Sequence, residues 1–169
     1  TMFAADYYVD STADASTATG ASTAPFATLK AAVDAANAQY SQDNIPSTIY
    51  VKGGAASSYT IKTSDDLMSV TAANLTVLPW ADFGAPRVYL DKELSTNINN
   101  PNVIRIESGA DNFTINGFEF YTYCDNKQKH SGTSLGESGR VFRIGAKYFT
   151  IEDCKFYQDN KSTQGNWGG

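Results

Sequence analysis

The sequence is poor in several residue types, and each shortage excludes a class of protein. Only 18% of its 169 residues are charged, and it holds two cysteines and one histidine. Two cysteines are too few for a disulfide-rich scaffold. The net charge of −5 and the lack of a Lys/Arg cluster argue against nucleic acid or anionic membrane as a partner. No apolar run approaches the roughly 20 residues of a membrane span.

What remains is a chain that is 41% hydrophobic and rich in Ser, Thr, Asn, Ala, Gly, Tyr and Phe, as a globular protein can be. Its length is enough for one domain with a substantial core. We therefore expect a single domain over residues 1–169.

The second half of the chain repeats itself. Residues 111–123 (DNFTINGFEFYTY) match residues 147–159 (KYFTIEDCKFYQD) at an offset of 36. Two further matches, at an offset of 38, are NLTV (74–77) with NFTI (112–115) and VIRI (103–106) with VFRI (141–144). Each of these segments alternates apolar and polar residues, which is typical of β-strands.

One repeat of about three short strands cannot bury its apolar side alone. Stacked copies can, because each strand then pairs with its counterpart about 4.8 Å away. We predict that Ile115 lies on Ile151 and Phe120 on Phe156, with all four side chains pointing inward. This predicts an all-β fold, a parallel β-helix (solenoid) of about four coils over residues 48–169. A flat β-sandwich would explain the alternation but not the matched offsets.

The first 47 residues follow another pattern. A short strand (YYVD) and a polar loop precede PFATLKAAVDAAN, which predicts a helix with Pro25 in its first turn. Its apolar residues recur at helical spacing on one face: Phe26, Leu29, Val33 and Ala36. We expect this helix to cover the open end of the first coil.

The stretches YYVDS, APFATLKAAVDAAN, TIYVKGG and YTI, in this order, resemble the opening of secreted right-handed β-helix proteins of the pectate-lyase-like superfamily. The later stretches NLTVLPW, APRVYLD, NVIRIES and DNFTINGFEFYTY are similar to coils of its alginate-lyase and chondroitinase-B branch. The likeness covers most of the chain and concerns the fold. It implies a right-handed coil and a secreted or cell-surface location. The segments NIPSTIYV and GGAASSYT depart from the usual pattern.

In the enzymes of that superfamily, the resemblance implies an outward Arg or Lys, often with bound Ca²⁺, and β-elimination on a uronic acid. No motif in this chain allows a catalytic residue to be transferred by position, so the catalytic residues stay unknown.

Basic residues suggest one candidate binding surface. Arg105 and Arg143 should stack outward on neighbouring strands, with Lys147 nearby, and could form a rail for an anionic glycan. Alternatively, the two arginines are merely solvated and turn towards Glu107 or Glu152.

Aromatic residues suggest a second surface. Tyr121 and Tyr157 should form an outward ladder, which can hold sugar rings or simply cover apolar surface. His130, the only histidine, lies in a long polar loop that could carry function. A lone histidine in such a loop can also be just exposed.

Acidic residues near the last repeat give a weak indication of a metal site. An oxygen-lined Ca²⁺ site could draw on Asp125, Glu152, Asp153 and Asp159. These residues lack an Asp-x-Asp spacing, so no firm metal site or cofactor is predicted.

Two functions fit these patterns. We favour an extracellular structural or adhesive module, a surface or filament component with glycan contact, because no catalytic constellation is found. The alternative is the N-terminal portion of a polysaccharide lyase or related carbohydrate-active enzyme acting on an anionic polysaccharide. In either case we expect polysaccharide as a partner. We also expect self-association or further coils at the C-terminal end, where the sequence predicts no cover for the last coil.

Overall fold

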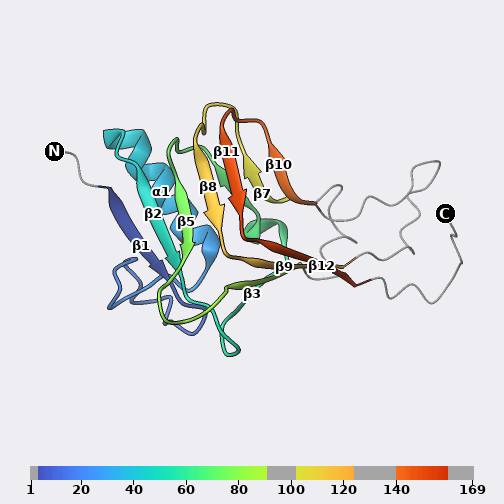
Figure 1. Ribbon diagram of the computed structural model, residues 1–169. Helices are drawn as coiled ribbons and strands as arrows, with labels where there is room; N and C mark the ends of the chain where they lie inside the picture. The colour runs from blue at the N-terminus through green and yellow to red at the C-terminus, as the bar shows by residue number, and fades with distance from the viewer. Residues whose placement is uncertain (1–3, 91–101, 124–139, 160–169) are drawn as a thin grey trace, which may run out of the picture.

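The computed structural model describes residues 4–90, 102–123 and 140–159. Within these ranges the chain forms one α-helix, one 3-10 turn and twelve strands, and the strands lie in three parallel sheets (Figure 1). The first sheet has the order β1 (Ala5–Val9), β2 (Ser47–Val51), β5 (Thr76–Pro79), β8 (Phe113–Asn116), β11 (Phe149–Glu152). The second has the order β4 (Met68–Val70), β7 (Asn102–Ile106), β10 (Arg140–Ile144). The third has the order β3 (Ser58–Ile61), β6 (Arg87–Leu90), β9 (Glu119–Tyr123), β12 (Lys155–Asp159).

The pairing of the repeated segments is confirmed. Ile151 pairs with Ile115, and Phe156 pairs with Phe120. At the offset of 38, Thr114 pairs with Thr76. The alternation is confirmed too, because inward residues of the middle strands are buried while outward ones stay accessible. Each inward aliphatic or aromatic side chain removed from water stabilises the fold by roughly 1.5–3 kcal/mol.

The predicted fold class is wrong. The chain is not all-β: within the described residues it is a mixed fold, and no right-handed parallel β-helix solenoid of about four coils is recognised in it. One helix and three parallel sheets share a single core. The physical reason is that helix α1 (Leu29–Asp43) contributes Leu29, Ala32, Val33 and Ala36 to this core and is thus an integral layer.

The start of α1 also differs from the expectation. Thr28 has extended backbone angles, and its hydroxyl accepts a hydrogen bond from the N–H of Ala31 at 3.2 Å. Threonine caps helices in this way, so the helix begins at Leu29 and Pro25 precedes it. Phe26 lies outside the helix and forms a bridge with Val9 of β1.

The helix packs against β1, β2 and β4 and covers the N-terminal end of the core. One of its polar side chains also completes the edge of β4. The Asn37 amide donates to the carbonyl of Ser69 at 2.7 Å and accepts from the N–H groups of Thr71 and Ala72. These bonds satisfy backbone groups that an edge strand would otherwise leave unpaired.

Candidate functional site

The outward side of the third sheet carries the most regular arrangement of functional groups. Tyr89, Tyr121 and Tyr157 occupy matching positions on β6, β9 and β12. Their rings stack with centroids 4.6 and 4.7 Å apart and planes within 13° of parallel. The predicted ladder of Tyr121 and Tyr157 is therefore confirmed, with Tyr89 as a third member. We call these three residues the tyrosine row.

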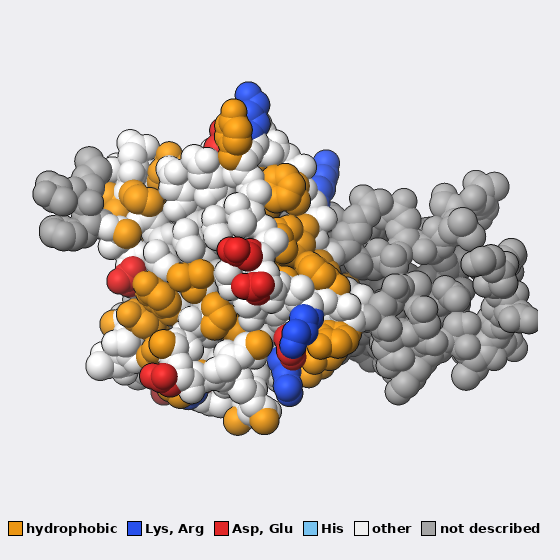
Figure 2. Space-filling model, viewed as in Figure 1, with side chains coloured by type: hydrophobic (Ala, Val, Ile, Leu, Met, Phe, Trp, Pro, Cys, Tyr) orange, Lys and Arg blue, Asp and Glu red, His pale blue; other side chains and the backbone are white. Residues whose placement is uncertain are grey.

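A charged row runs beside the tyrosine row at the next outward position of the same strands. Glu119 stands in its centre, between Arg87 and Lys155. Its carboxylate contacts the Arg87 Nε at 3.1 Å and the Lys155 Nζ at 3.5 Å, and it accepts a hydrogen bond from the Tyr121 hydroxyl at 3.0 Å. Figure 2 shows acidic, basic and hydrophobic side chains side by side over this part of the molecule.

These contacts fix the charge of Glu119. Partial desolvation opposes its ionisation, but the hydrogen bonds from Tyr121, Arg87 and Lys155 outweigh that effect and lower its pKa. Partial desolvation and the bond to Glu119 raise the pKa of Tyr121. The carboxylate therefore stays ionised at neutral pH and is already engaged by three donors. Such a group can order a surface, but it is poorly suited to take a proton from a substrate.

A cleft of about 310 Å³ lies at the free edge of β3, where the third sheet approaches the start of α1. Its lining includes Ser11, Thr28, Lys30, Thr60 and Lys62. Thr60 pairs in register with Tyr89, so the cleft opens at the end of the tyrosine row. Tyr89, the end of the row, is therefore one strand away from the lining of the cleft.

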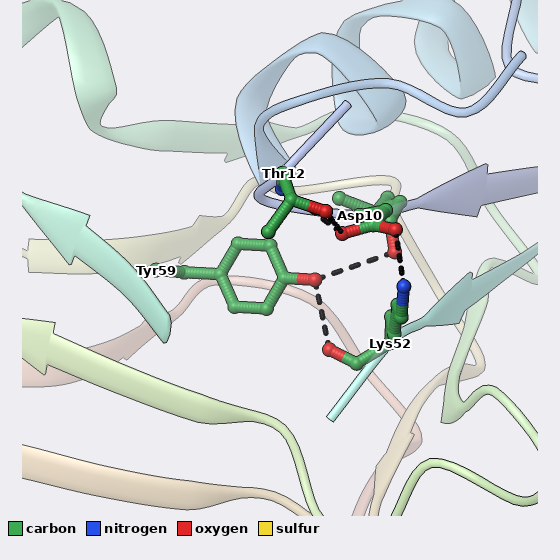
Figure 3. A network of polar contacts seen from close by, with 5 residues as sticks. Asp10, Thr12, Lys52 and Tyr59 are labelled. Carbon is green, nitrogen blue, oxygen red and sulfur yellow. Dashed lines mark hydrogen bonds and ion pairs between the residues drawn. The ribbon is translucent and has the colours of Figure 1, made fainter. Parts of the chain in front are cut away.

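A polar network behind the cleft holds this corner of the fold together (Figure 3). Asp10 accepts from the N–H and hydroxyl of Thr12 at 2.9 and 2.7 Å and forms an ion pair with Lys52 at 2.6 Å. The Tyr59 hydroxyl lies 2.8 Å from the Lys52 carbonyl and 3.3 Å from the Val9 carbonyl. Three separate segments, the end of β1, the end of β2 and β3, are joined in this way.

The groups of this network are engaged with one another. Burial opposes ionisation of Asp10, yet the bonds from Lys52 and Thr12 prevail and lower its pKa. Burial raises the pKa of Tyr59, so its hydroxyl remains protonated. We therefore regard the network as structural support that positions the cleft.

The predicted basic rail is only partly assembled. Arg105 and Arg143 pair in register on β7 and β10, and both are exposed. The Arg105 Nε lies 3.3 Å from a Glu107 carboxylate oxygen, which also accepts from the Ser69 hydroxyl at 2.9 Å. Arg105 thus adopts the alternative arrangement, turning to Glu107. Lys147 is exposed next to β11, and its backbone N–H donates a hydrogen bond to the Asp111 carboxylate at 2.8 Å.

The acidic candidates do not meet in the part of the chain that the structure describes. Glu152 accepts from the Asn116 amide at 3.1 Å, and Asp153 occupies an exposed turn with φ of 50°. Asp125, His130 and the side chain of Asp159 lie outside the described residues. No group of three or more His, Cys, Asp or Glu able to hold a metal is found among the described residues.

Sequence reasoning missed an aromatic cluster on the outward side of the first sheet. Tyr8 stacks on Tyr50 with centroids 5.1 Å apart and lies 4.9 Å from Trp80, which contacts Phe83. Figure 2 shows hydrophobic side chains gathered over this end of β1, β2 and β5. The outward positions of Tyr8 and Tyr50 on their strands could have indicated this cluster, because the two strands are neighbours in the first sheet.

Comparisons with protein-family models, with curated proteins and with solved structures found no match to this chain. The resemblance to the pectate-lyase-like superfamily therefore stays a prediction. Among the described residues, no helix is long and apolar enough to cross a membrane.

Proposed function

We propose that this chain is an extracellular structural or adhesive module, a component of a cell surface or filament, that contacts glycan chains through the tyrosine row. The observation that carries the proposal is the stack of Tyr89, Tyr121 and Tyr157 beside the charged row centred on Glu119. The superfamily resemblance supports a secreted or cell-surface location.

The geometry of the stack suits binding to an extended polymer. The rings repeat every 4.6–4.7 Å along the sheet and hold one another in place, so little side-chain freedom is lost when a ligand binds. Stacked rings cover each other's faces, and the sugar hydroxyls would meet ring edges, phenol hydroxyls and the charged row. Tyrosine is suited to this role because it joins an apolar ring to a polar tip.

Two charged side chains, one beside the tyrosine row and one on the second sheet, favour binding over turnover. Glu119 is held ionised by three donors, and Arg105 on the second sheet is engaged with Glu107. Neither side chain is arranged as a free base or free cation, as the lyase alternative would require of them. We infer in addition that the module associates with further protein at β10, β11 and β12, which each have a strand partner on one side only within the described residues.

The proposal is tested by affinity electrophoresis in gels containing neutral or uronic-acid polysaccharides. Tyr121→Ser breaks the middle of the stack and should reduce the retardation by a binding glycan several-fold. Tyr50→Ser makes the same chemical change in the aromatic cluster on the first sheet and serves as the matched control.

The proposal is supported if a polysaccharide retards the wild type and Tyr50→Ser but no longer retards Tyr121→Ser. Loss in Tyr50→Ser alone would move glycan contact to the first sheet and overturn the assignment to the tyrosine row. No retardation by any polysaccharide would remove the glycan part of the proposal. Release of unsaturated uronic acid, seen as new ultraviolet absorbance, would favour the lyase alternative.

A further inference from the structure

The strands that end the three sheets on the C-terminal side leave apolar side chains exposed. Phe149 and Phe156 are 47% and 54% exposed, whereas Phe113 and Phe120, their register partners one strand further in, are 1% exposed. Figure 2 shows hydrophobic side chains gathered on this side of the molecule, over β10 and β11. We call the exposed residues the terminal face; its members are Ile144, Tyr148, Phe149, Phe156 and Tyr157.

The terminal face also offers backbone groups for pairing. Within the described residues, β10, β11 and β12 each have a strand partner on one side only. Free N–H and C=O groups on such edges readily recruit another strand. Several large apolar side chains exposed at one end of a fold indicate an interaction site.

The repeated residues indicate what kind of surface would fit. Phe149 follows Phe113 and Ile151 follows Ile115 in the same rows, so the next layer should again present Phe and Ile at strand spacing. The terminal face of a second copy provides those side chain types. The opposite end of the core does not, because α1 packs there against β1, β2 and β4.

The charges beside β11 point to one relative orientation of two copies. Exposed Lys147 precedes this strand, and exposed Glu152 and Asp153 stand at its end. A two-fold axis through the middle of β11 would make the strand antiparallel to its copy and exchange its two ends. Lys147 then meets the partner's Asp153, and the symmetry repeats this contact.

The same axis keeps the pattern of inward and outward side chains. An axis that points into the core and passes through Thr150 places this residue opposite its own copy. Phe149 then lies opposite the partner's Ile151, so inward apolar side chains meet inward apolar side chains. A pairing shifted by one residue would set an inward side chain against an outward one.

We propose that the chain forms a closed two-fold dimer through its terminal face, with β11 of the two copies antiparallel and Lys147 paired with the partner's Asp153. This inference rests on the assembly part of the proposed function and names its partner as a second copy. Because the other end of each core is covered by α1, the contact stops at two copies. The dimer would present two tyrosine rows, and two linked sites bind a polymer more tightly than one.

The test is the mass of the chain in solution, measured by light scattering and sedimentation over a range of concentrations. The wild type should be a dimer whose dissociation constant rises about tenfold or more in Lys147→Glu and in Asp153→Lys. The double variant K147E/D153K reverses both charges and should recover most of the lost affinity. Circular dichroism of each variant checks that the fold is kept.

A monomer at every soluble concentration, or growth into longer polymers, would overturn the two-fold dimer. A dimer whose affinity is unchanged by both single charge reversals would overturn the interface described here. Whether polysaccharide in the gel retards a monomeric variant is measured separately. This measurement distinguishes failure of the dimer from failure of the proposed function.

Discussion

Asn112 donates a hydrogen bond from its side-chain amide to the side-chain oxygen of Asn74, 3.0 Å away. Both residues have positive φ, 60° and 58°, and each directly precedes a repeated apolar strand segment. Asparagine tolerates this left-handed conformation better than most residues. The next position in the same series is Tyr148, which has φ of 55° and is 77% exposed. The last repeat thus places a bulky residue where the earlier ones use asparagine.

We predict that Tyr148→Asn stabilises the chain. Asparagine relieves the left-handed strain of tyrosine and can extend the bond series from Asn112. The gain in the free energy of unfolding should be a few tenths to about 1 kcal/mol. Urea unfolding at a concentration that keeps the chain monomeric measures it, and Tyr148→Ala, which shortens the side chain without adding an amide, serves as the control. Equal stability of the two variants would show that the amide contributes nothing.

Phe120 and Phe156 should respond very differently to truncation, although the sequence predicts equal roles for them. Phe120 is 1% exposed and Phe156 is 54% exposed, with ring centroids 5.4 Å apart. Phe120→Ala leaves a cavity in the core and should cost about 3–5 kcal/mol. Phe156→Ala should cost less than about 1.5 kcal/mol, measured at a concentration that keeps the chain monomeric. Similar losses in both would mean that the last strands are covered within the monomer.

Asn37 should contribute more to the free energy of unfolding than its place on a helix surface indicates. Its amide bonds three backbone groups at the edge of β4, so Asn37→Ala leaves these groups without their partner. We expect a loss of about 1–2 kcal/mol in urea unfolding. Gln39→Ala is the control, because the Gln39 amide donates its hydrogen bond to Asp43 of the same helix. A loss no greater than that of the control would contradict the edge-capping role.

Asp10 should make stability depend on pH in the acid range. Its pKa is lower in the folded chain than its ordinary value of about 3.9. The stabilisation is therefore present above that value and is lost as pH falls through the lower, folded pKa. The free energy of unfolding, measured from neutral to strongly acid pH, should fall less steeply below about pH 4 in Asp10→Asn than in the wild type. An unchanged slope in the variant would exclude Asp10 as a source of the effect.

The sequence by itself determined the repeated strands in the second half of the chain and, for those strands, the pairing partners. The alternation of apolar and polar residues, as in Ile104, Arg105 and Ile106, predicted the strands. The offsets of 36 and 38 predicted which of the repeated strands are neighbours. These features are local or repeated, so a linear pattern can carry them. The same reasoning placed Tyr121 and Tyr157 on one outward row.

Only the tertiary structure decided what joins segments far apart in the chain. No repeat relates Glu119 to Arg87, Asp10 to Lys52, or Asn37 to the edge of β4, yet these contacts set the charges and hold the corners of the fold. The fold class also depended on packing, because helix α1 became a layer of the core by burying one face against three strands. The period of the apolar and polar pattern predicts on which face of a strand or helix a side chain lies. Which residue of another element that side chain contacts depends on how the elements pack in space.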